Sequence, residues 1–249
     1  MNIFKKLVRF FILKSNVLRG DIHRNDTYGA LFKAWGYVFT NHLSGDYVEF
    51  GVYKGDSLIS SMKIYDDFRQ WLFGQMKSTE MWRKEVANES TLIQKPIFHC
   101  FDTFEGMPEN NEGAISFQKG NFACDLASVK EKVSLSNKKL YGVEYYKGLF
   151  SKTSEDFHKI IGNRKIAIAN IDCDLEESSI DALKSIENNI QIGTVILFDD
   201  YNCFNADNNR GQRKAFLRFQ NKSNFIFDKF FSYNFVGQAF LVTGIEESL

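Results

Sequence analysis

The sequence predicts an α/β fold, with a mostly parallel sheet of seven strands and helices on both of its faces. Short apolar runs recur along the chain with helix-like segments between them, which is the order that a parallel sheet requires. The last two runs have no convincing helix between them. We therefore expect a C-terminal hairpin that adds one antiparallel strand.

The strands are expected at residues 47–51, 97–102, 143–147, 166–172, 195–199, 225–230 and 238–242. The helices are expected at residues 56–73, 125–133, 153–161, 178–188 and 211–220. Asp125 is a natural N-cap for the second helix. The fourth helix places Ile180, Leu183 and Ile186 on one face, as a helix that covers a sheet should. Residues 68–95 are polar in their second half, which favours an insertion between the first two strands.

The composition is that of a packed domain without a strong charge. Lys plus Arg and Asp plus Glu both number 31, so no global field favours nucleic acid. The chain has 25 Phe and only 2 Pro, and no apolar run reaches the roughly 18 residues of a membrane span. The four cysteines form no C-x-x-C pair, which argues against a disulfide framework or a zinc site. A cytoplasmic protein is expected.

Residues 1–40 are expected to form a basic amphipathic helix and a helical cap, ahead of the main domain at residues 41–249. The first stretch carries Lys5, Lys6, Arg9 and Lys14 among apolar residues, and no small-residue cleavage site follows it. Two interpretations are open. The helix docks on the core or on a second subunit, or it makes peripheral contact with a membrane surface. We favour docking on protein, and with it a homo-oligomer, since most amphipathic helices face protein.

Paired acids follow two of the buried strands. Asp172 and Asp174 end one strand, and Asp199 and Asp200 end the next. Carboxylates this close repel one another and lose water, unless a positive charge lies among them. Hard oxygen ligands suit Mg²⁺ or another divalent cation. The sequence therefore predicts a cation site beyond the carboxyl ends of the strands, where ligands of open α/β sheets bind.

The first two strands also end in acids. Glu49 is followed by Gly51, Gly55 and Ser57, a turn that lets a ligand approach the backbone and the free N–H groups of the next helix. The spacing is neither the G-x-G-x-x-G of a dinucleotide fold nor a P-loop. Asp102 ends the second strand, where an acid can accept hydrogen bonds from a ribose diol. An ordinary tight turn and a capping acid are the alternative interpretations.

Several motifs follow one another in order between about residues 45 and 220. They are Glu49-Phe-Gly-Val-Tyr-Lys-Gly55, Phe101-Asp-Thr-Phe-Glu-Gly-Met-Pro108, Lys147-Gly-Leu-Phe-Ser-Lys-Thr153, Asn170-Ile-Asp-Cys-Asp-Leu-Glu-Glu-Ser-Ser179, Phe198-Asp-Asp-Tyr201 and Gly211-Gln-Arg-Lys-Ala215. Together they resemble the macrocin O-methyltransferase family. These enzymes have a Rossmann-like class I methyltransferase fold, use S-adenosylmethionine and methylate sugar hydroxyls with the help of a divalent metal. Two departures are visible. The interval from Gly51 to Asp102 is long for the family, and Glu176 stands where the family often has Tyr.

The resemblance implies a role for each of these residues. Asp102 would hold the ribose hydroxyls of the cofactor, and Phe104 would lie against its adenosine. The metal would be bound by Asp172, Asp199 and Asp200, leaving Asp174 as the candidate general base. The residues alone do not say whether Asp172 or Asp174 takes the proton. The pocket for the methionine part would be shaped by Glu49, Gly51, Gly55 and Ser57.

The sequence is thus interpreted as an S-adenosylmethionine-dependent, Mg²⁺-assisted O-methyltransferase. The acceptor would be a hydroxyl of a sugar or glycoconjugate, from a nucleotide sugar to a cell-surface polysaccharide or a secondary metabolite. Two alternatives remain. One is a metal-dependent phosphoester hydrolase that uses the same acids. The other is a non-catalytic cofactor-binding protein.

Overall fold

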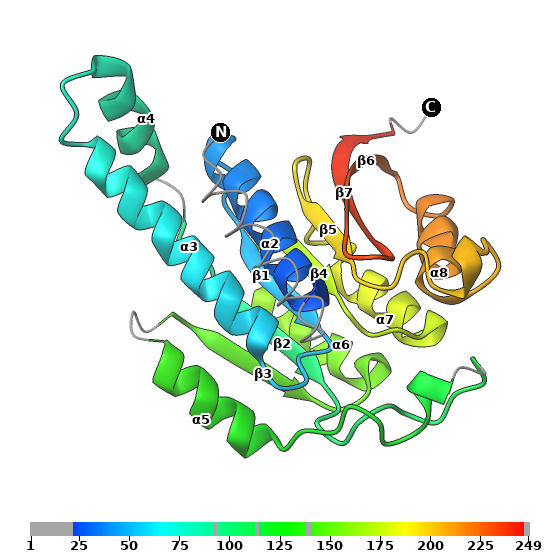
Figure 1. Ribbon diagram of the computed structural model, residues 1–249. Coiled ribbons are helices and arrows are strands. Elements are labelled where there is room, and N and C mark those ends of the chain that lie inside the picture. The colour runs from blue at the N-terminus through cyan, green and yellow to red at the C-terminus, as the bar shows by residue number, and fades with distance from the viewer. Residues whose placement is uncertain (1–21, 92–93, 113–114, 138–140, 247–249) are drawn as a thin grey trace, which may run out of the picture.

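The computed structural model describes residues 22–91, 94–112, 115–137 and 141–246 (Figure 1). The helices are α2 (Ile22–Thr40), α3 (Asp56–Gln75), α4 (Met81–Thr91), α5 (Leu126–Ser136), α6 (Phe150–Ile161), α7 (Glu176–Ile186) and α8 (Gly211–Gln220), with the short 3₁₀ turns η1 (Ile115–Phe117) and η2 (Phe204–Ala206). The strands are β1 (Asp46–Phe50), β2 (Phe98–Asp102), β3 (Val143–Lys147), β4 (Ile166–Ile171), β5 (Val195–Phe198), β6 (Phe225–Tyr233) and β7 (Gly237–Ile245).

The seven strands form one sheet in the order β3-β2-β1-β4-β5-β7-β6. Strands β1 to β5 pair in parallel, whereas β7 is antiparallel to both β5 and β6. This topology confirms the predicted fold class. The C-terminal hairpin is longer than expected, because pairing continues through Ser232 and Tyr233 to Gly237, and backbone pairing needs no apolar pattern to continue.

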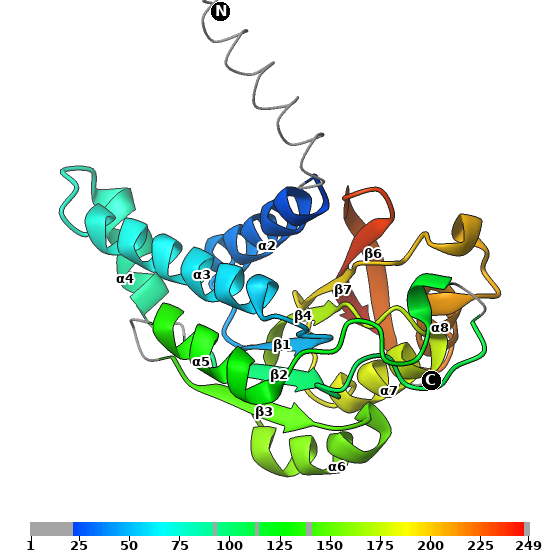
Figure 2. The same cartoon turned by 60° about the horizontal axis from the view of Figure 1, so that its bottom comes forward.

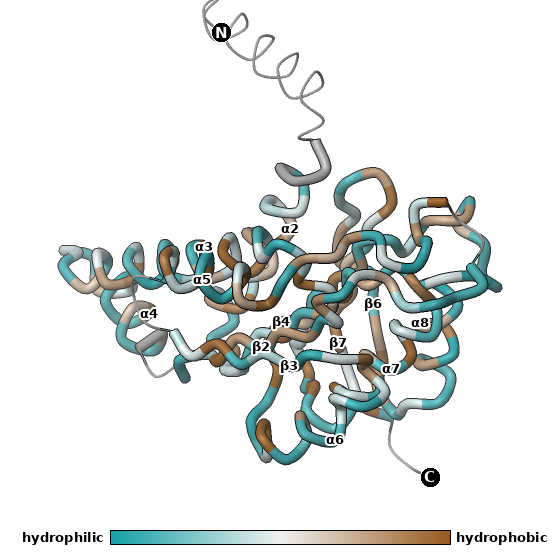
Figure 3. Tube along the Cα trace, turned by 90° about the horizontal axis from the view of Figure 1, so that it is seen from below, coloured by the Kyte–Doolittle hydropathy of each residue, from teal (hydrophilic) through white to brown (hydrophobic). Residues whose placement is uncertain are grey.

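Helices cover both faces of the sheet (Figure 2). Helices α2, α3 and α5 pack with Tyr47 and Ile168 on one face, whereas α6, α7 and α8 pack with Val48 and Ile171 on the other. Along the chain trace, hydrophobic residues recur in the central strands and polar residues in the outer segments (Figure 3). The parallel strands therefore end together at one edge, between two layers of helices.

Two helices begin earlier than the sequence predicts. Helix α6 starts at Phe150 instead of residue 153, and α7 starts at Glu176 instead of residue 178. Their N-cap positions are held by Leu149 and Leu175, which make no side-chain cap, so the usual polar start signal is missing from the sequence. In contrast, Asp125 caps α5 as expected, since its side chain accepts a hydrogen bond from the Ser128 N–H.

The segment at residues 68–95 contains the end of α3 and the helix α4. The C-terminal end of α3 and helix α4 form a helical hairpin that extends beyond the sheet (Figure 1). Its origin as an insertion stays a prediction. The expected basic helix at the N-terminus lies outside the described residues. None of the helices that are described is long and apolar enough to cross a membrane.

A buried charge network fixes the amino ends of the strands. The Asp46 side chain is fully buried and accepts hydrogen bonds from the Ile97 N–H at 2.8 Å and the Arg164 Nε at 2.7 Å. Arg164 Nη2 also donates to this carboxylate, and His99 Nε2 lies 3.3 Å from it. The network joins β1, β2 and the turn before β4. His99 is thus a core residue at the end of the sheet opposite the acids, as its place in an apolar strand suggests.

Candidate active site

The turn after β1 requires glycine because it lies against the end of β4. Gly51 has φ +93°, and a Cβ built on it would lie 1.7 Å from the backbone oxygen of Asp172. The Gly51 N–H donates to Phe101 O at 2.9 Å, and the Asp172 N–H donates to Phe50 O at 2.8 Å. Gly55, also at positive φ, precedes α3 and faces Val129. The turn thereby brings the ends of β1, β2 and β4 together.

Glu49 lies beneath this turn and is fully buried. Its carboxylate accepts hydrogen bonds from the Tyr47 hydroxyl at 2.6 Å and from the Ser57 hydroxyl. Burial raises the pKa of Glu49 to about 7, although both hydrogen bonds oppose the shift. None of Glu49, Gly55 and Ser57 lines the cavity described below. Glu49 and Ser57 therefore support the turn from inside the protein.

Asp102 joins the end of β2 to the same turn. One carboxylate oxygen accepts hydrogen bonds from the N–H groups of Val52 and Tyr53, both at 2.8 Å, and the other accepts from the Phe104 N–H at 2.7 Å. The side chain faces the cavity. Phe104 has a left-handed backbone with φ +54° and packs in the core, where it is only 5% exposed. Its contact with adenosine stays a prediction.

Three of the predicted acids meet at the carboxyl ends of β4 and β5. Each of Asp172, Asp199 and Asp200 offers a carboxylate oxygen, and these atoms lie within 4.8 Å of one another. Asp199 is 3% exposed and accepts a hydrogen bond from Asn234 Nδ2 at 3.0 Å. Asp174, with φ +59°, lines the same cavity. The structure thus brings all four acids to one place.

The acids strongly perturb one another. Burial raises the pKa of Asp172 well above its usual range, and the Asp199 and Asp200 carboxylates add to the shift. Burial likewise raises the pKa of Asp174, with a further contribution from Asp200. Three oxygen donors that repel one another in a buried place are a set that fits a hard divalent cation such as Mg²⁺. The assignment of this ion to the three acids is a proposal taken up below.

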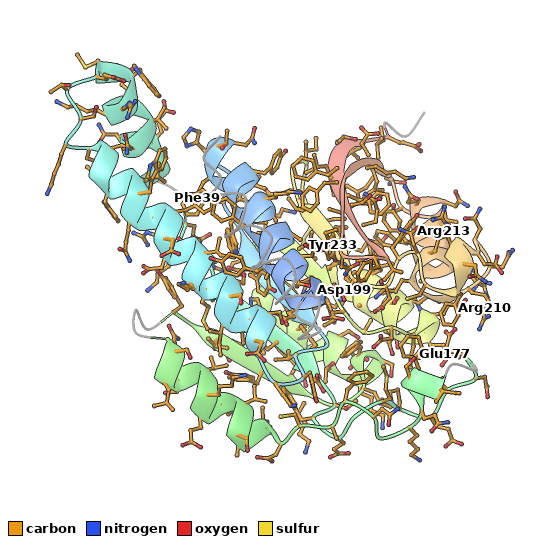
Figure 4. All side chains as sticks on the ribbon, in the orientation of Figure 1. Phe39, Glu177, Asp199, Arg210, Arg213 and Tyr233 are labelled. Carbon is orange, nitrogen blue, oxygen red and sulfur yellow. The ribbon has the colours of Figure 1, made fainter. Side chains whose placement is uncertain are left out.

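Two buried polar atoms lie near this cluster without a partner. Among the described residues, no hydrogen bond reaches the Tyr233 hydroxyl or the Asn170 amide nitrogen. Asn170 precedes Asp172 by two residues and therefore lies on the same side of β4. Tyr233 adjoins Asn234, and Figure 4 shows Tyr233 beside Asp199 in the interior. Unpartnered polar atoms are costly when buried, and a bound water would satisfy them.

A buried glutamine holds the two acid-bearing strand ends together. Gln212, at the start of α8, is 1% exposed. Its amide nitrogen donates to Ile171 O at 3.0 Å, and its amide oxygen accepts from the Asp200 N–H at 2.9 Å. Sequence reasoning assigned it no role, although it lies within one of the quoted motifs. Its place in that motif was the only available signal.

A cavity of about 400 Å³ connects Asp102 to the acid cluster. Its lining is largely apolar around a few acids, which is typical of a small-molecule site. Apart from the predicted Gly51, Asp102, Asp172, Asp174, Asp199 and Asp200, it includes Tyr53, Thr103, Gly106, Met107, Pro108, Phe117, Phe122, Leu149, Phe150, Cys173 and Ser178. Most of these lie in irregular segments, where no periodic pattern marks a residue as facing a cavity.

The basic residues around the start of α8 contact protein groups. Lys214 pairs with Glu176 at 2.8 Å, and Arg213 donates to Asn202 Oδ1 at 2.8 Å. Arg210 donates to Glu112 O at 2.6 Å and stacks over the Phe204 ring. Figure 4 shows Arg210 and Arg213 on the outer side of the molecule. The cluster therefore fixes loops around the site.

The comparisons with known proteins agree with this arrangement. The O-methyltransferase NovP matches with a TM-score of 0.62 and 17% identity, over 88% of this chain and 80% of that chain. The calicheamicin methyltransferase CalS11 matches with a TM-score of 0.65 and 16% identity, over 92% of this chain and 85% of that chain. At such identities the likeness establishes the fold. No curated protein matches the sequence.

The sequence itself matches a family model. The model for macrocin-O-methyltransferase (TylF) covers residues 79–228, which is more than half of the chain. This range includes the ends of β2, β4 and β5 that carry Asp102 and the acid cluster. The chain therefore belongs to the macrocin O-methyltransferase (TylF) family and is an S-adenosylmethionine-dependent O-methyltransferase.

Proposed function

We propose that the protein methylates a hydroxyl of a sugar or glycoconjugate, with the assistance of a divalent cation. The observation that carries the proposal is the set of Asp172, Asp199 and Asp200, whose oxygens converge within 4.8 Å at a cavity that Asp102 also lines. CalS11, which shares the fold, is a TDP-rhamnose 3'-O-methyltransferase in calicheamicin biosynthesis. This supports a nucleotide sugar as the acceptor, with a polysaccharide or a secondary metabolite as the wider class.

The cofactor would occupy the end of the cavity near β1 and β2. Asp102 is held by three backbone N–H groups, which orient its carboxylate. It would accept hydrogen bonds from the ribose hydroxyls, as acids do at this place in nucleotide-binding sheets. Gly51 lines the cavity and would lie beside the methionine part, and the hydrogen bond between Ser57 and Glu49 supports its turn from inside the protein.

Asp172, Asp199 and Asp200 would hold the cation. When bound, the cation would stabilise the negative charge that develops on the attacking oxygen. Gln212 keeps the three carboxylates in register, because it bonds to the backbone of both strand ends. Asp199 is further oriented by the Asn234 amide. The protein thus presents its oxygen donors in a fixed arrangement, which spares the reorganisation that a flexible set would require.

Asp174 is the residue that we assign to the proton of the acceptor hydroxyl, with Asp172 as the alternative. Asp174 faces the cavity from the turn between β4 and α7, and its left-handed backbone turns this segment away from the strand direction. General-base assistance typically contributes about 10²–10⁴-fold to a rate. A further contribution comes from holding the sulfonium and the acceptor oxygen at roughly 3–3.5 Å.

The experiment is transfer of a labelled methyl group from S-adenosylmethionine to a panel of nucleotide sugars and glycosides. We expect transfer to a sugar hydroxyl, its loss with EDTA and its recovery with Mg²⁺. Calorimetric titration with S-adenosylhomocysteine, with and without Mg²⁺, separates cofactor binding from cation binding. Full activity in EDTA would contradict the role of the cation. Binding of the cofactor without transfer to any sugar would contradict the acceptor class.

A further inference from the structure

The cavity has two chemically different ends, and one loop contacts both. At the cofactor end, the ring of Tyr53 meets the ring of Phe122 edge to face, with centroids 5.8 Å apart. Tyr53 also donates its N–H to Asp102. At the acid end, the ring of Phe117 meets that of Phe204 at 6.0 Å. Phe204 follows Asp199 and Asp200 in the same loop, so Phe117 lies on the acid side.

Phe117 is held in place at the end of the short 3₁₀ turn η1. It is 8% exposed, and its carbonyl accepts a hydrogen bond from Asn110 Nδ2 at 2.7 Å. The base of the loop is closed by backbone pairing, with the Met107 N–H donating to Asn121 O at 2.8 Å and the Gly120 N–H donating to Met107 O at 2.9 Å. Phe117 lines the cavity, and these hydrogen bonds hold the backbone of its loop in place.

Glu112 ties the same loop to the acid end. Its carboxylate accepts the N–H of Glu176 at 2.8 Å, at the first residue of α7 and two residues after Asp174. Its carbonyl accepts a hydrogen bond from Arg210 at 2.6 Å. The loop is thereby fixed to the turn that carries the assigned base. Any molecule between Phe117 and Asp174 would lie beside the three carboxylates.

We propose that Phe117 is the platform on which the ring of the acceptor sugar packs, and that it determines acceptor binding. The inference rests on the proposed function and adds the residue that orients its substrate. One face of a pyranose ring presents C–H groups, and an aromatic face is a favourable partner for them because it is apolar and carries negative charge. With the apolar face on Phe117, the hydroxyls at the ring edge can reach the acids.

The experiment compares Phe117→Ala, Phe117→Leu and Phe117→Tyr, with Phe122→Ala as the matched control at the cofactor end. The acceptor probes are TDP-rhamnose and methyl rhamnoside, one charged and one neutral, which share the sugar. We expect Phe117→Ala and Phe117→Leu to raise the acceptor KM about tenfold, a difference of roughly 1.4 kcal/mol. Phe117→Tyr should keep an acceptor KM close to that of the wild type. The Kd for S-adenosylhomocysteine should change less than twofold. Phe122→Ala should instead weaken the binding of S-adenosylhomocysteine.

The outcomes separate the platform from the function on which it rests. An unchanged acceptor KM in Phe117→Ala, with normal transfer by the wild type, overturns the platform and leaves the methyltransferase assignment. Loss of S-adenosylhomocysteine binding in Phe117→Ala also overturns it, because the ring would then belong to the cofactor end. A Phe117→Trp variant reports binding directly by its fluorescence. No response to either sugar, together with no transfer by the wild type, overturns both proposals.

Discussion

Replacing Gly51 with alanine tests how closely the β1 turn and the acid cluster depend on one another. A Cβ at this position would lie 1.7 Å from the backbone oxygen of Asp172, whereas real Cβ contacts essentially never fall below 3.0 Å. The neighbouring atom is backbone and cannot rotate away as a side chain would. The turn and the end of β4 must therefore separate by at least 1.3 Å, the difference between the two distances.

The replacement of Gly51 by alanine has two separate effects, one on the rate and one on stability. A misplacement of about 1 Å can reduce a rate roughly 100-fold, so we expect kcat of Gly51→Ala to fall by about that factor, since Asp172 carries one of the acids. The positive φ of +93° adds strain, typically about 1–3 kcal/mol for a residue with a side chain. For a protein of this size that corresponds to a decrease in Tm of roughly 2–12 °C.

Gly120→Ala is the matched control. Gly120 has a similar φ of +85°, yet no atom lies within 4 Å of the Cβ position. It should lower Tm through backbone strain and leave kcat close to that of the wild type. The assays are thermal unfolding and single-turnover methyl transfer with a sugar identified by the panel. If Gly51→Ala keeps the wild-type kcat, or if both variants lose it equally, the contact with Asp172 is not the cause.

Three further predictions concern charge. Asp46→Asn should lower the free energy of unfolding by about 3 kcal/mol, because it leaves buried partners of Asp46 unpaired. The control Asp56→Asn, at an exposed position, should lower it by less than about 1 kcal/mol. Both are measured by urea unfolding at pH 7. Although burial opposes it, hydrogen bonds from Arg164 and His99 lower the pKa of Asp46. The stabilisation by Asp46 is therefore present above the pKa of this residue in the unfolded chain and is lost as the pH falls below about 4. Equal free energies of unfolding for the wild type and Asp46→Asn at pH 7 would exclude this contribution. Burial raises the pKa of Glu49 to about 7. This contribution to stability is fully present below the pKa of Glu49 in the unfolded chain, and it is lost as the pH rises through the folded pKa. The free energy of unfolding of the wild type should therefore decrease from about pH 4.5 to 7. Glu49→Gln should abolish this pH dependence, and an unchanged pH dependence in the variant would contradict the prediction. Mg²⁺ at 100 times its Kd should raise the free energy of unfolding of the wild type by about 2.7 kcal/mol. An equal increase in Asp199→Asn would exclude the ion from this site.

The meeting of the acids could be predicted because it follows from topology. Asp172 and Asp199 end two buried strands, and a parallel sheet brings the carboxyl ends of neighbouring strands to one edge. The register confirms that β4 and β5 are neighbours, with Ile171 opposite Phe198. Gly51 could be predicted in the same way, since its turn directly follows β1. The alternation of strands and helices along the sequence, which indicates a parallel sheet, was sufficient to predict this part of the site.

The loop between β2 and α5 could not be predicted in this way. Glu112 reaches Glu176 across 64 residues of sequence, and a single sequence contains no signal of such a pairing. Phe117 and Phe122 belong to no amphipathic pattern that would mark them as facing a cavity. The burial of Phe104 could not be predicted either. The resemblance implies that this residue lies against adenosine, and the structure places its side chain in the core, where it is 5% exposed.

The departure of this chain at Glu176 and the position of Phe117 have a common explanation. Where the resembled family often has Tyr, Glu176 forms ion pairs with Lys214 at 2.8 Å and with Arg218 at 2.9 Å. Its side chain therefore joins α7 to α8 and is not available to pack on a sugar. Its N–H is bonded to Glu112, which belongs to the loop that carries Phe117. The aromatic surface that we propose at the acid end is therefore supplied by the loop, and the N–H of Glu176 fixes that loop in place.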